Sequence, residues 1–195
     1  MLGGAFNPPH LGHLALAESA REQLRLEKVL LVTTGSAPHK EISPEPGPEV
    51  RLELTRRAVE GVEGVEASGL EVEREGPSYM FETLEALDGE AGKHVIWLIC
   101  GADIASTLPD WERPERVLEL AGLAVAPRPG AEIEVVAESI SSLGFDPEER
   151  LVRLDFAPSD ISSTEVRRRC ATGESIDDLV SPRVSEMIES EGLYR

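Results

Sequence analysis

The stretch from Gly3 to His13, GGAFNPPHLGH, decides the fold of this chain. Its glycines let the backbone approach a ligand more closely than a Cβ would allow, and its prolines stiffen the turn and cannot continue a strand. His10 and His13 precede a helical pattern from Leu14 to Leu26, and their spacing puts both imidazoles on one face of its first turn. That turn offers unpaired backbone N–H groups and the positive end of the helix dipole. Together these features predict a polyphosphate site.

The residue types alone also allow a structural role for this stretch. A Gly-Gly turn before a helix is common, and a single histidine is more often structural than functional. Two histidines that flank a glycine directly after a Pro-Pro turn are harder to explain by packing. The physical argument therefore favours the phosphate site over the structural alternative.

Length and charge limit the function classes. The 195 residues predict one domain, 1–195, with a core of its own, and no apolar run is long enough to span a bilayer. No signal-peptide pattern precedes the glycine turn. The formal net charge of −18 repels nucleic-acid backbones and anionic membranes, so we expect no nucleic-acid and no membrane partner. An acidic protein that binds a triphosphate needs local positive charge or Mg²⁺.

The two cysteines indicate neither a metal site nor a redox pair. Cys100 and Cys170 lie far apart and in no C-x-x-C pattern. We expect small, buried or half-buried thiols, which suit the reducing cytoplasm.

Apolar strands alternate with amphipathic helical segments, which predicts an α/β fold with a Rossmann-like, doubly wound parallel sheet covered by helices on both faces. Only Met1 and Leu2 precede the glycines, so either the first strand is very short or the chain begins downstream of its natural start. Further strands are expected at 28–33, 65–72 (weaker), 94–100, 123–126 and 151–154. Helices are expected at 14–26, 49–59, 81–87, 163–171 and 183–191.

Every expected strand is followed by polar, basic or glycine-rich residues. Ligands of open parallel sheets bind beyond the carboxyl ends of the strands, so these residues should converge on one site. After the His10/His13 turn, the residues in chain order are Gly35, Ser36, Pro38, His39 and Lys40, then Gly101, Ala102 and Asp103, then Arg128 and Gly130, and finally Asp160, Ser162, Ser163, Thr164 and Arg167.

The basic and hydroxyl residues of this set could also have roles without a ligand contact. Lys40 suits a phosphate contact and a solvated lysine equally well, and the segment 35–48 around it is either a linker or a functional loop. Ser162 to Thr164 can be a helix cap, which is compatible with a phosphate site. Of the run Arg167 to Arg169, we expect Arg167, one turn after Ser163, to face inward.

Two further residues of the later segments are candidates for ligand contacts. Asp103 either accepts ribose hydroxyls or closes a turn, and we slightly favour the first. Trp111, flanked by Asp110, Glu112 and Arg113, is awkward as a core residue and better as a half-exposed stacking plate.

The opening stretch also resembles the G-x-F-x-P-x-H-x-G-H signature of the nucleotidyltransferase superfamily. It matches every fixed position of that signature, namely Gly4, Phe6, Pro8, His10, Gly12 and His13. Over nearly the whole chain, further segments are similar to the bacterial nicotinate-nucleotide adenylyltransferases. They are Ala37-Pro38-His39-Lys40, Arg51-Leu52, Gly76 to Leu84, Gly101-Ala102-Asp103, Trp111, Arg128-Pro129-Gly130, Ile161 to Arg167 and Gly192-Leu193-Tyr194.

The chain departs from that family at several positions. Ala37 stands where the family has Pro, Met80 where it usually has Thr, and Glu82 where it usually has Asp. Ser181-Pro182 replaces a Val-Pro arrangement. Met80 falls in the region that contacts the pyridine ring, so the choice between nicotinate and nicotinamide stays open.

The resemblance implies that ATP and nicotinate mononucleotide react to give nicotinate adenine dinucleotide and pyrophosphate in NAD biosynthesis. It assigns catalytic roles to His13, His10, Lys40 and Arg167, and a phosphate-site role to the helical part at about 160–195. ATP would contact Gly4, Ala5, Phe6, His10, Gly12, His13, Gly101, Asp103, Ile161, Ser162, Ser163, Thr164 and Arg167. Nicotinate mononucleotide would contact Asn7, Lys40, Thr83, Asp103, Trp111, Glu112 and Arg128.

In that assignment, Mg²⁺ accompanies ATP, largely hydrated and with no direct protein ligand. The backbone near Thr83 and Glu112 would receive the nicotinate carboxylate. The resemblance is also compatible with a homo-oligomer formed through a helix.

Other functions fit part of the pattern. Within the superfamily, the acceptor can instead be nicotinamide mononucleotide or phosphopantetheine, although Trp111 and the segment Ser78 to Leu84 favour a pyridine nucleotide. A tRNA synthetase fragment shares the H-x-G-H pattern, but this chain is too short and too acidic for tRNA. A non-catalytic nucleotide sensor would not need His10, His13, Lys40 and Arg167 together.

Overall fold

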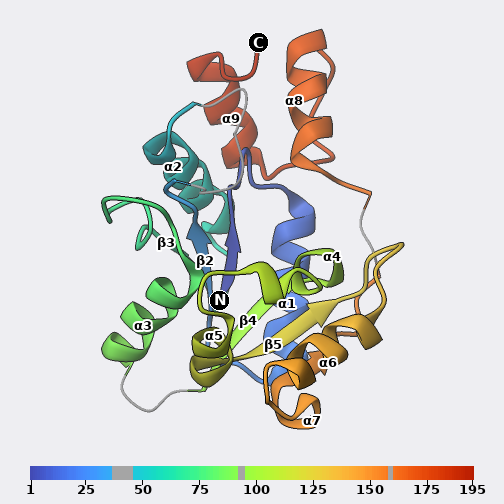
Figure 1. The fold of residues 1–195 in the computed structure, drawn as a ribbon. Coiled ribbons are helices and arrows are strands. Elements are labelled where there is room, and N and C mark those ends of the chain that lie inside the picture. The colour runs from blue at the N-terminus through green and yellow to red at the C-terminus, as the bar shows by residue number, and fades with distance from the viewer. Residues whose placement is uncertain (37–45, 92–94, 158–159) are drawn as a thin grey trace.

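The computed structural model describes residues 1–36, 46–91, 95–157 and 160–195, and their central feature is a parallel sheet (Figure 1). In these residues the sheet has six strands in the order β3-β2-β1-β4-β5-β6, which confirms the expected doubly wound α/β fold. The strands are β1 (Leu2–Gly4), β2 (Val29–Thr33), β3 (Val65–Ser68), β4 (Ile96–Gly101), β5 (Ala121–Ala126) and β6 (Leu151–Arg153). The helices are α1 (Leu11–Leu24), α2 (Pro48–Val59), α3 (Met80–Ala91), α4 (Ala102–Ala105), the 3₁₀ turn η1 (Leu108–Asp110), α5 (Pro114–Leu120), α6 (Ile133–Ser142), α7 (Pro147–Arg150), α8 (Ser163–Thr172) and α9 (Pro182–Glu191).

Both faces of the sheet are buried because the strands are almost continuously apolar. Alternate residues of β4 enter opposite cores: Ile99 packs on one face, and Leu98 and Cys100 pack on the other. The first core also takes side chains from α1, α2, α8 and α9, and the second takes side chains from α3 to α6. Both cysteines are free, as expected.

The expected strands and helices are confirmed, with ends shifted by a few residues. The first helix begins at Leu11 rather than Leu14, because His10 already occupies its N-cap with extended backbone. The strand expected at 65–72 ends at Ser68, since the chain turns there and the Glu73 N–H bonds the Gly69 carbonyl.

Four helices between the fourth and sixth strands were not foreseen. The helices α4, α5 and α7 have four, seven and four residues, too few to show a helical period. The longer α6 is rich in β-branched residues, which lower its helix propensity, and it forms because Val136 and Ile140 are buried against the sheet. Among the described helices, none is long and apolar enough to cross a membrane.

A buried arginine joins the carboxyl ends of the neighbouring strands β1 and β2. Arg51 of α2 is fully buried, and its guanidinium donates to the carbonyls of Ala5 and Thr34 at 2.7 Å and of Gly35 at 3.1 Å. These carbonyls belong to residues that come directly after β1 and β2. Arg51 therefore pairs with three half-buried main-chain acceptors at once and fixes the spacing of the two loops.

Arg51→Lys should destabilise the protein by about 2–4 kcal/mol, because an ammonium at this buried position cannot reproduce the guanidinium fork and leaves at least one of the three carbonyls unpaired. Urea unfolding measures the loss. The control is Arg56→Lys, one turn along the same helix and half exposed, which should change stability by less than about 0.5 kcal/mol. Equal effects of the two substitutions would contradict the role given to Arg51.

Candidate active site

The two histidines of the opening turn lie against each other at the start of α1. Their ring centroids are 3.7 Å apart with 27° between the ring planes, as the spacing predicts for one helix face. The His13 ring also meets the edge of the buried Phe6 ring, with centroids 5.0 Å apart. The two imidazoles are thus held rigidly beyond the end of β1.

Burial and nearby positive charge keep both rings neutral. Burial, followed by the positive charge of Arg128, lowers the pKa of His10 to about 4. Burial also lowers the pKa of His13, with His10 and then Arg128 as further causes. The backbone N–H of His10 donates to Nδ1 of His13 at 3.2 Å, so the proton of neutral His13 is on Nε2. At neutral pH His13 can therefore donate a hydrogen bond to an anion without carrying a charge.

The turn before the histidines is held by residues more than 150 positions away. The Ser163 hydroxyl donates to the Pro8 carbonyl at 2.8 Å, and the Arg167 guanidinium donates to the Asn7 carbonyl at 2.7 Å. The Leu11 N–H bonds the Leu179 carbonyl at 2.8 Å. The start of α8 is therefore brought against the histidine turn, as the convergence of strand ends predicted.

Arg167 is the inward-facing member of the arginine run, as expected. Its guanidinium reaches Asn7 and also donates to the Thr164 hydroxyl at 3.3 Å. Arg168 and Arg169 turn away and pair with carboxylates of Glu165, Glu174 and Asp178. Ser162 is the N-cap of α8, accepting from the Glu165 N–H at 3.2 Å, so the cap interpretation is confirmed.

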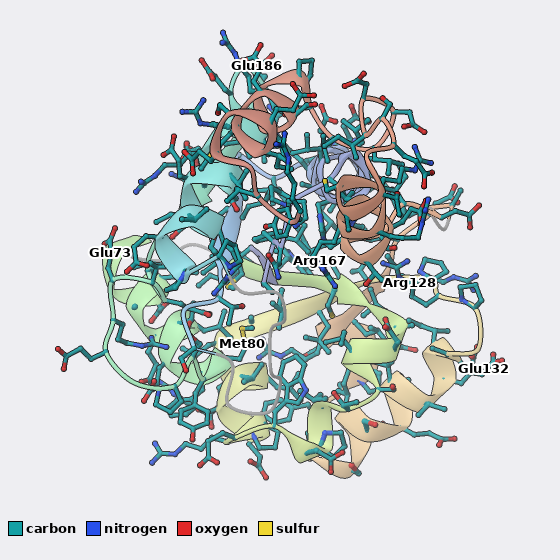
Figure 2. All side chains as sticks on the ribbon, turned by 90° about the horizontal axis from the view of Figure 1, so that it is seen from above. Glu73, Met80, Arg128, Glu132, Arg167 and Glu186 are labelled. Atoms are coloured by element: carbon teal, nitrogen blue, oxygen red, sulfur yellow. The ribbon has the colours of Figure 1, made fainter. Side chains whose placement is uncertain are left out.

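Arg128 lies beside the histidines. A Cβ on Gly101 would meet Arg128 side-chain atoms at 3.2 Å and Asp103 Oδ1 at 2.5 Å, so Gly101 leaves the room in which both side chains lie. Figure 2 shows Arg128 and Arg167 near one another in that view, with Met80 farther away. The positive charge of Arg128 acts on both histidines, and its expected contact with the acceptor nucleotide stays a prediction.

A cavity of about 250 Å³ adjoins the turn on the side of α3. The Trp111 indole is half buried in its wall and is fixed by donating from Nε1 to the Thr107 hydroxyl at 2.9 Å. Met80 also lines the cavity. The residues around the cavity are Gly3, Gly4, Thr34, Glu71, Ser78, Tyr79, Met80, Leu98, Ile99, Cys100, Ile104, Asp110, Trp111 and Glu112. Its size and its aromatic wall suit a single planar ring.

Glu71 is a residue of this cavity that sequence reasoning missed. Its carboxyl is almost fully buried and accepts from the Thr83 hydroxyl at 2.9 Å. Burial raises its pKa, while hydrogen bonds from Thr83, Ser78 and the Gly35 backbone oppose the shift. Glu71 thus ties the end of β2 to α3. The only sequence signal was a glutamate close to the Ser78 to Leu84 segment.

Two residues expected to contact the acceptor are enclosed by the protein. Thr83 is fully buried, and its backbone N–H donates to the Tyr79 carbonyl at 3.2 Å. Asn7 is 4% exposed, and its side-chain carbonyl accepts from the Tyr194 hydroxyl at 2.7 Å. Both residues are thus held by protein contacts, and their contact with the acceptor stays a prediction.

Comparison with known proteins identifies the family. Residues 1–169 match the family model described as cytidylyltransferase-like. A protein of Roseiflexus sp. (strain RS-1) named "Probable nicotinate-nucleotide adenylyltransferase" is 41% identical over 197 residues, covering 100% of this chain and 96% of the relative. A protein of the same name from Salinibacter ruber is 38% identical over 196 residues, with the same coverages. This chain belongs to the nicotinate-nucleotide adenylyltransferases.

A solved structure shares the fold of this adenylyltransferase. The Plasmodium falciparum nicotinic acid mononucleotide adenylyltransferase complexed with NaAD has a TM-score of 0.75 to this chain. The two are 16% identical, and the match covers 99% of this chain and 95% of the other. At that identity, the likeness concerns the fold alone.

The remaining candidate residues of the adenylyltransferase lie around the same edge. Asp103 and Glu112 are exposed at the ends of β4 and η1, and Gly12 and Ile161 are half exposed near the turn. The Ala5 carbonyl is bound by Arg51, which makes this residue part of the loop scaffold. Lys40 lies outside the described residues.

The neutral state of His10 should make the free energy of unfolding fall at acidic pH. The folded pKa of about 4 lies below the ordinary 6.5, so the stability contributed by neutral His10 is complete above pH 6.5 and is lost as the pH falls through about 4. The loss should approach about 3 kcal/mol, measured as the difference in unfolding free energy between the wild type and His10→Gln. Wild type and variant carry the same carboxylates, so the contribution of these groups to the pH dependence cancels in this difference. A His10 imidazole that titrates near 6.5 by NMR would contradict the assignment.

Proposed function

We propose that this protein transfers the adenylyl group of ATP to nicotinate mononucleotide, giving nicotinate adenine dinucleotide and pyrophosphate in NAD biosynthesis. The observation that carries the proposal is the position of the histidine turn, with Arg128 and Arg167 beside it, next to the Trp111 cavity. A triphosphate on the turn and a pyridine ring in the cavity would bring the two substrates together at the carboxyl edge of the sheet. The family names of the relatives support the same reaction.

The chemistry needs positioning and charge stabilisation more than a covalent intermediate. The 5′-phosphate of the acceptor is already an anion and can attack the α-phosphorus of ATP in line, while pyrophosphate leaves. Neutral His13 would donate through Nε2, and His10 would lie beside it, to oxygens whose charge grows in the transition state. The guanidiniums of Arg128 and Arg167 would offset the charge that builds on the leaving group. Lys40 is proposed for the same task on sequence grounds alone.

The start of α8 would hold the outer phosphates. Ser163 and Thr164 lie in its first turn, where free backbone N–H groups and the helix dipole favour anions. This is why we assign residues 160–195 to the phosphate site rather than to a separate function. The adenosine would lie between this segment and Gly101, with Asp103 available to ribose hydroxyls.

A divalent metal would come with the nucleotide. Among the described residues, no three His, Cys, Asp or Glu side chains lie together as a metal site would need, and Asp103 is a single carboxylate beside Gly101. Such a donor set fits a hydrated Mg²⁺ bound mainly by phosphate oxygens. When bound, it supplies further positive charge to the triphosphate.

The acceptor ring would stack on Trp111 against Met80. The Trp111 indole is fixed by Thr107, so it offers a preformed plate. Glu71 and Glu112 both line the cavity, and neither carboxyl side chain would attract a nicotinate carboxylate. Backbone groups near Glu112 would therefore receive it. ATP as a substrate and two free cysteines favour a cytoplasmic location.

Pyrophosphate release with ATP and Mg²⁺ tests the proposal, with nicotinate mononucleotide compared against nicotinamide mononucleotide. We expect kcat/KM to favour the nicotinate form. Equal use would mean that the pocket around Met80 accepts both rings. Release with neither acceptor, while ATP still binds, would overturn the proposal in favour of another acceptor or a nucleotide sensor.

His13→Ala should lower kcat by about 10²–10³-fold, because it removes one preorganised donor to the transition state. Steady-state pyrophosphate release measures this loss. Arg168→Met serves as the control: its guanidinium pairs with Glu165 and Glu174 on the outer side of α8, so kcat should stay within about twofold of wild type. Full activity of His13→Ala would remove His13 from the mechanism.

A further inference from the structure

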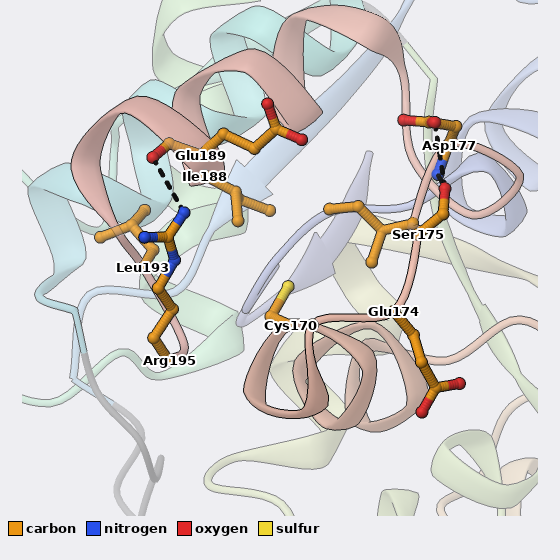
Figure 3. Close-up of a pocket in the computed structure, with 10 residues that line it drawn as sticks. Cys170, Glu174, Ser175, Asp177, Ile188, Glu189, Leu193 and Arg195 are labelled. Carbon is orange, nitrogen blue, oxygen red and sulfur yellow. Dashed lines mark hydrogen bonds between the residues drawn. The ribbon is translucent and has the colours of Figure 1, made fainter.

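The side chain of Tyr194 faces the histidine turn although its neighbours in sequence face elsewhere. Leu193 and Arg195 line the groove of about 430 Å³ between α8 and α9, where the Arg195 guanidinium approaches the Glu189 carbonyl (Figure 3). Tyr194 is buried, and its hydroxyl donates to Oδ1 of Asn7 at 2.7 Å, across 187 positions of sequence. One turn of chain after α9 thus sends a single side chain toward the active site.

The backbone at Tyr194 adopts a conformation that a side chain disfavours. Its φ is +63°, in the left-handed region, two residues after the Gly192 C-cap, which has the same φ. Aromatic residues rarely adopt this conformation, and where they do the surrounding structure must hold it. Here the Leu193 N–H bonds the Ile188 carbonyl at 3.0 Å, which closes the turn and directs the phenol ring inward.

Asn7 links Tyr194 to the phosphate side of the site. Its side-chain carbonyl accepts from Tyr194, and its main-chain carbonyl accepts from Arg167 at 2.7 Å. One residue therefore receives the phenol on one side and the guanidinium on the other. A rotation of the Asn7 side chain or peptide would move the Arg167 contact and the adjacent Pro8 carbonyl, which Ser163 binds.

We propose that Tyr194 is a positioning residue for adenylyl transfer, acting through Asn7 on Arg167 and on the turn that carries His10 and His13. This inference rests on the proposed function. Tyr194 contacts no substrate in this scheme. It fixes Asn7, whose main-chain carbonyl holds the Arg167 guanidinium in position. Small displacements of a catalytic group are costly in rate, so the hydroxyl matters for kcat more than for folding.

Tyr194→Phe tests the proposal, because it removes only the hydroxyl. We expect kcat for pyrophosphate release to fall roughly tenfold, with a much smaller change in KM for the acceptor. The matched control is Ser185→Ala in α9, which also removes a buried hydroxyl, one that donates to Asp177 at 3.2 Å and not to the turn. Its kcat should stay within about twofold of wild type. Equal kcat values for the two variants would overturn the proposal.

A double-mutant cycle shows whether Tyr194 acts through Asn7. In the Asn7→Ala background, Tyr194→Phe should lower kcat no further, because the accepting carbonyl is already gone. A second, multiplicative tenfold loss would overturn the route through Asn7. The comparison of Tyr194→Phe with Ser185→Ala decides the main point even where Asn7→Ala does not fold.

Failure of the proposed function can be told apart from failure of this inference. Wild type that turns over no acceptor overturns the function, whereas active wild type with fully active Tyr194→Phe overturns only the inference. ATP titration provides a readout that needs no acceptor. Tyr194→Phe should weaken ATP binding by about threefold or more relative to Ser185→Ala, since Arg167 loses its fixed position. Equal ATP affinity in an enzyme without turnover would count against the proposal.

Discussion

The structure depends on how the main-chain carbonyls of the first loop are satisfied. Strand β1 ends at Gly4, and the carbonyls of Ala5, Asn7 and Pro8 then leave the sheet in a buried region. Each accepts from a side chain far away in sequence: Arg51, Arg167 and Ser163. Buried carbonyls need partners, so these three donors determine where the loop lies. The His10/His13 turn, and with it the site, follows from that arrangement.

Charge is distributed so that a strongly acidic chain still offers an anion site. The positive charge of Arg128 acts on the two histidines, while Arg167 is held on the same turn. The histidines themselves stay neutral because they are buried. They therefore add no positive charge that would repel the two arginines. On the other side of the turn, the Glu71 carboxyl is surrounded by hydroxyl and amide donors and joins β2 to α3.

Much of the fold could be predicted because its strands are short, apolar runs separated by helical periods. Local periodicity could not show α4, α5 or α7, which are too short, and β-branched residues concealed α6. The positions of His10, His13 and Arg167 followed from spacing within one helix turn. The true surroundings of Asn7, Thr83, Glu71 and Arg128 did not, because each depends on a contact with a distant segment that no local pattern encodes.

The long-range clamp on the histidine turn also has a consequence for the order in which the protein is made. The turn from Gly3 to His13 is translated before its partners Ser163, Arg167 and Tyr194, which lie more than 150 positions later in the sequence. A nascent chain therefore carries the nucleotide-binding signature long before it can form the nucleotide site. The proposed phosphate site can form only after these partners are made, and a chain released without residues 160–195 carries the signature without the side chains that hold it.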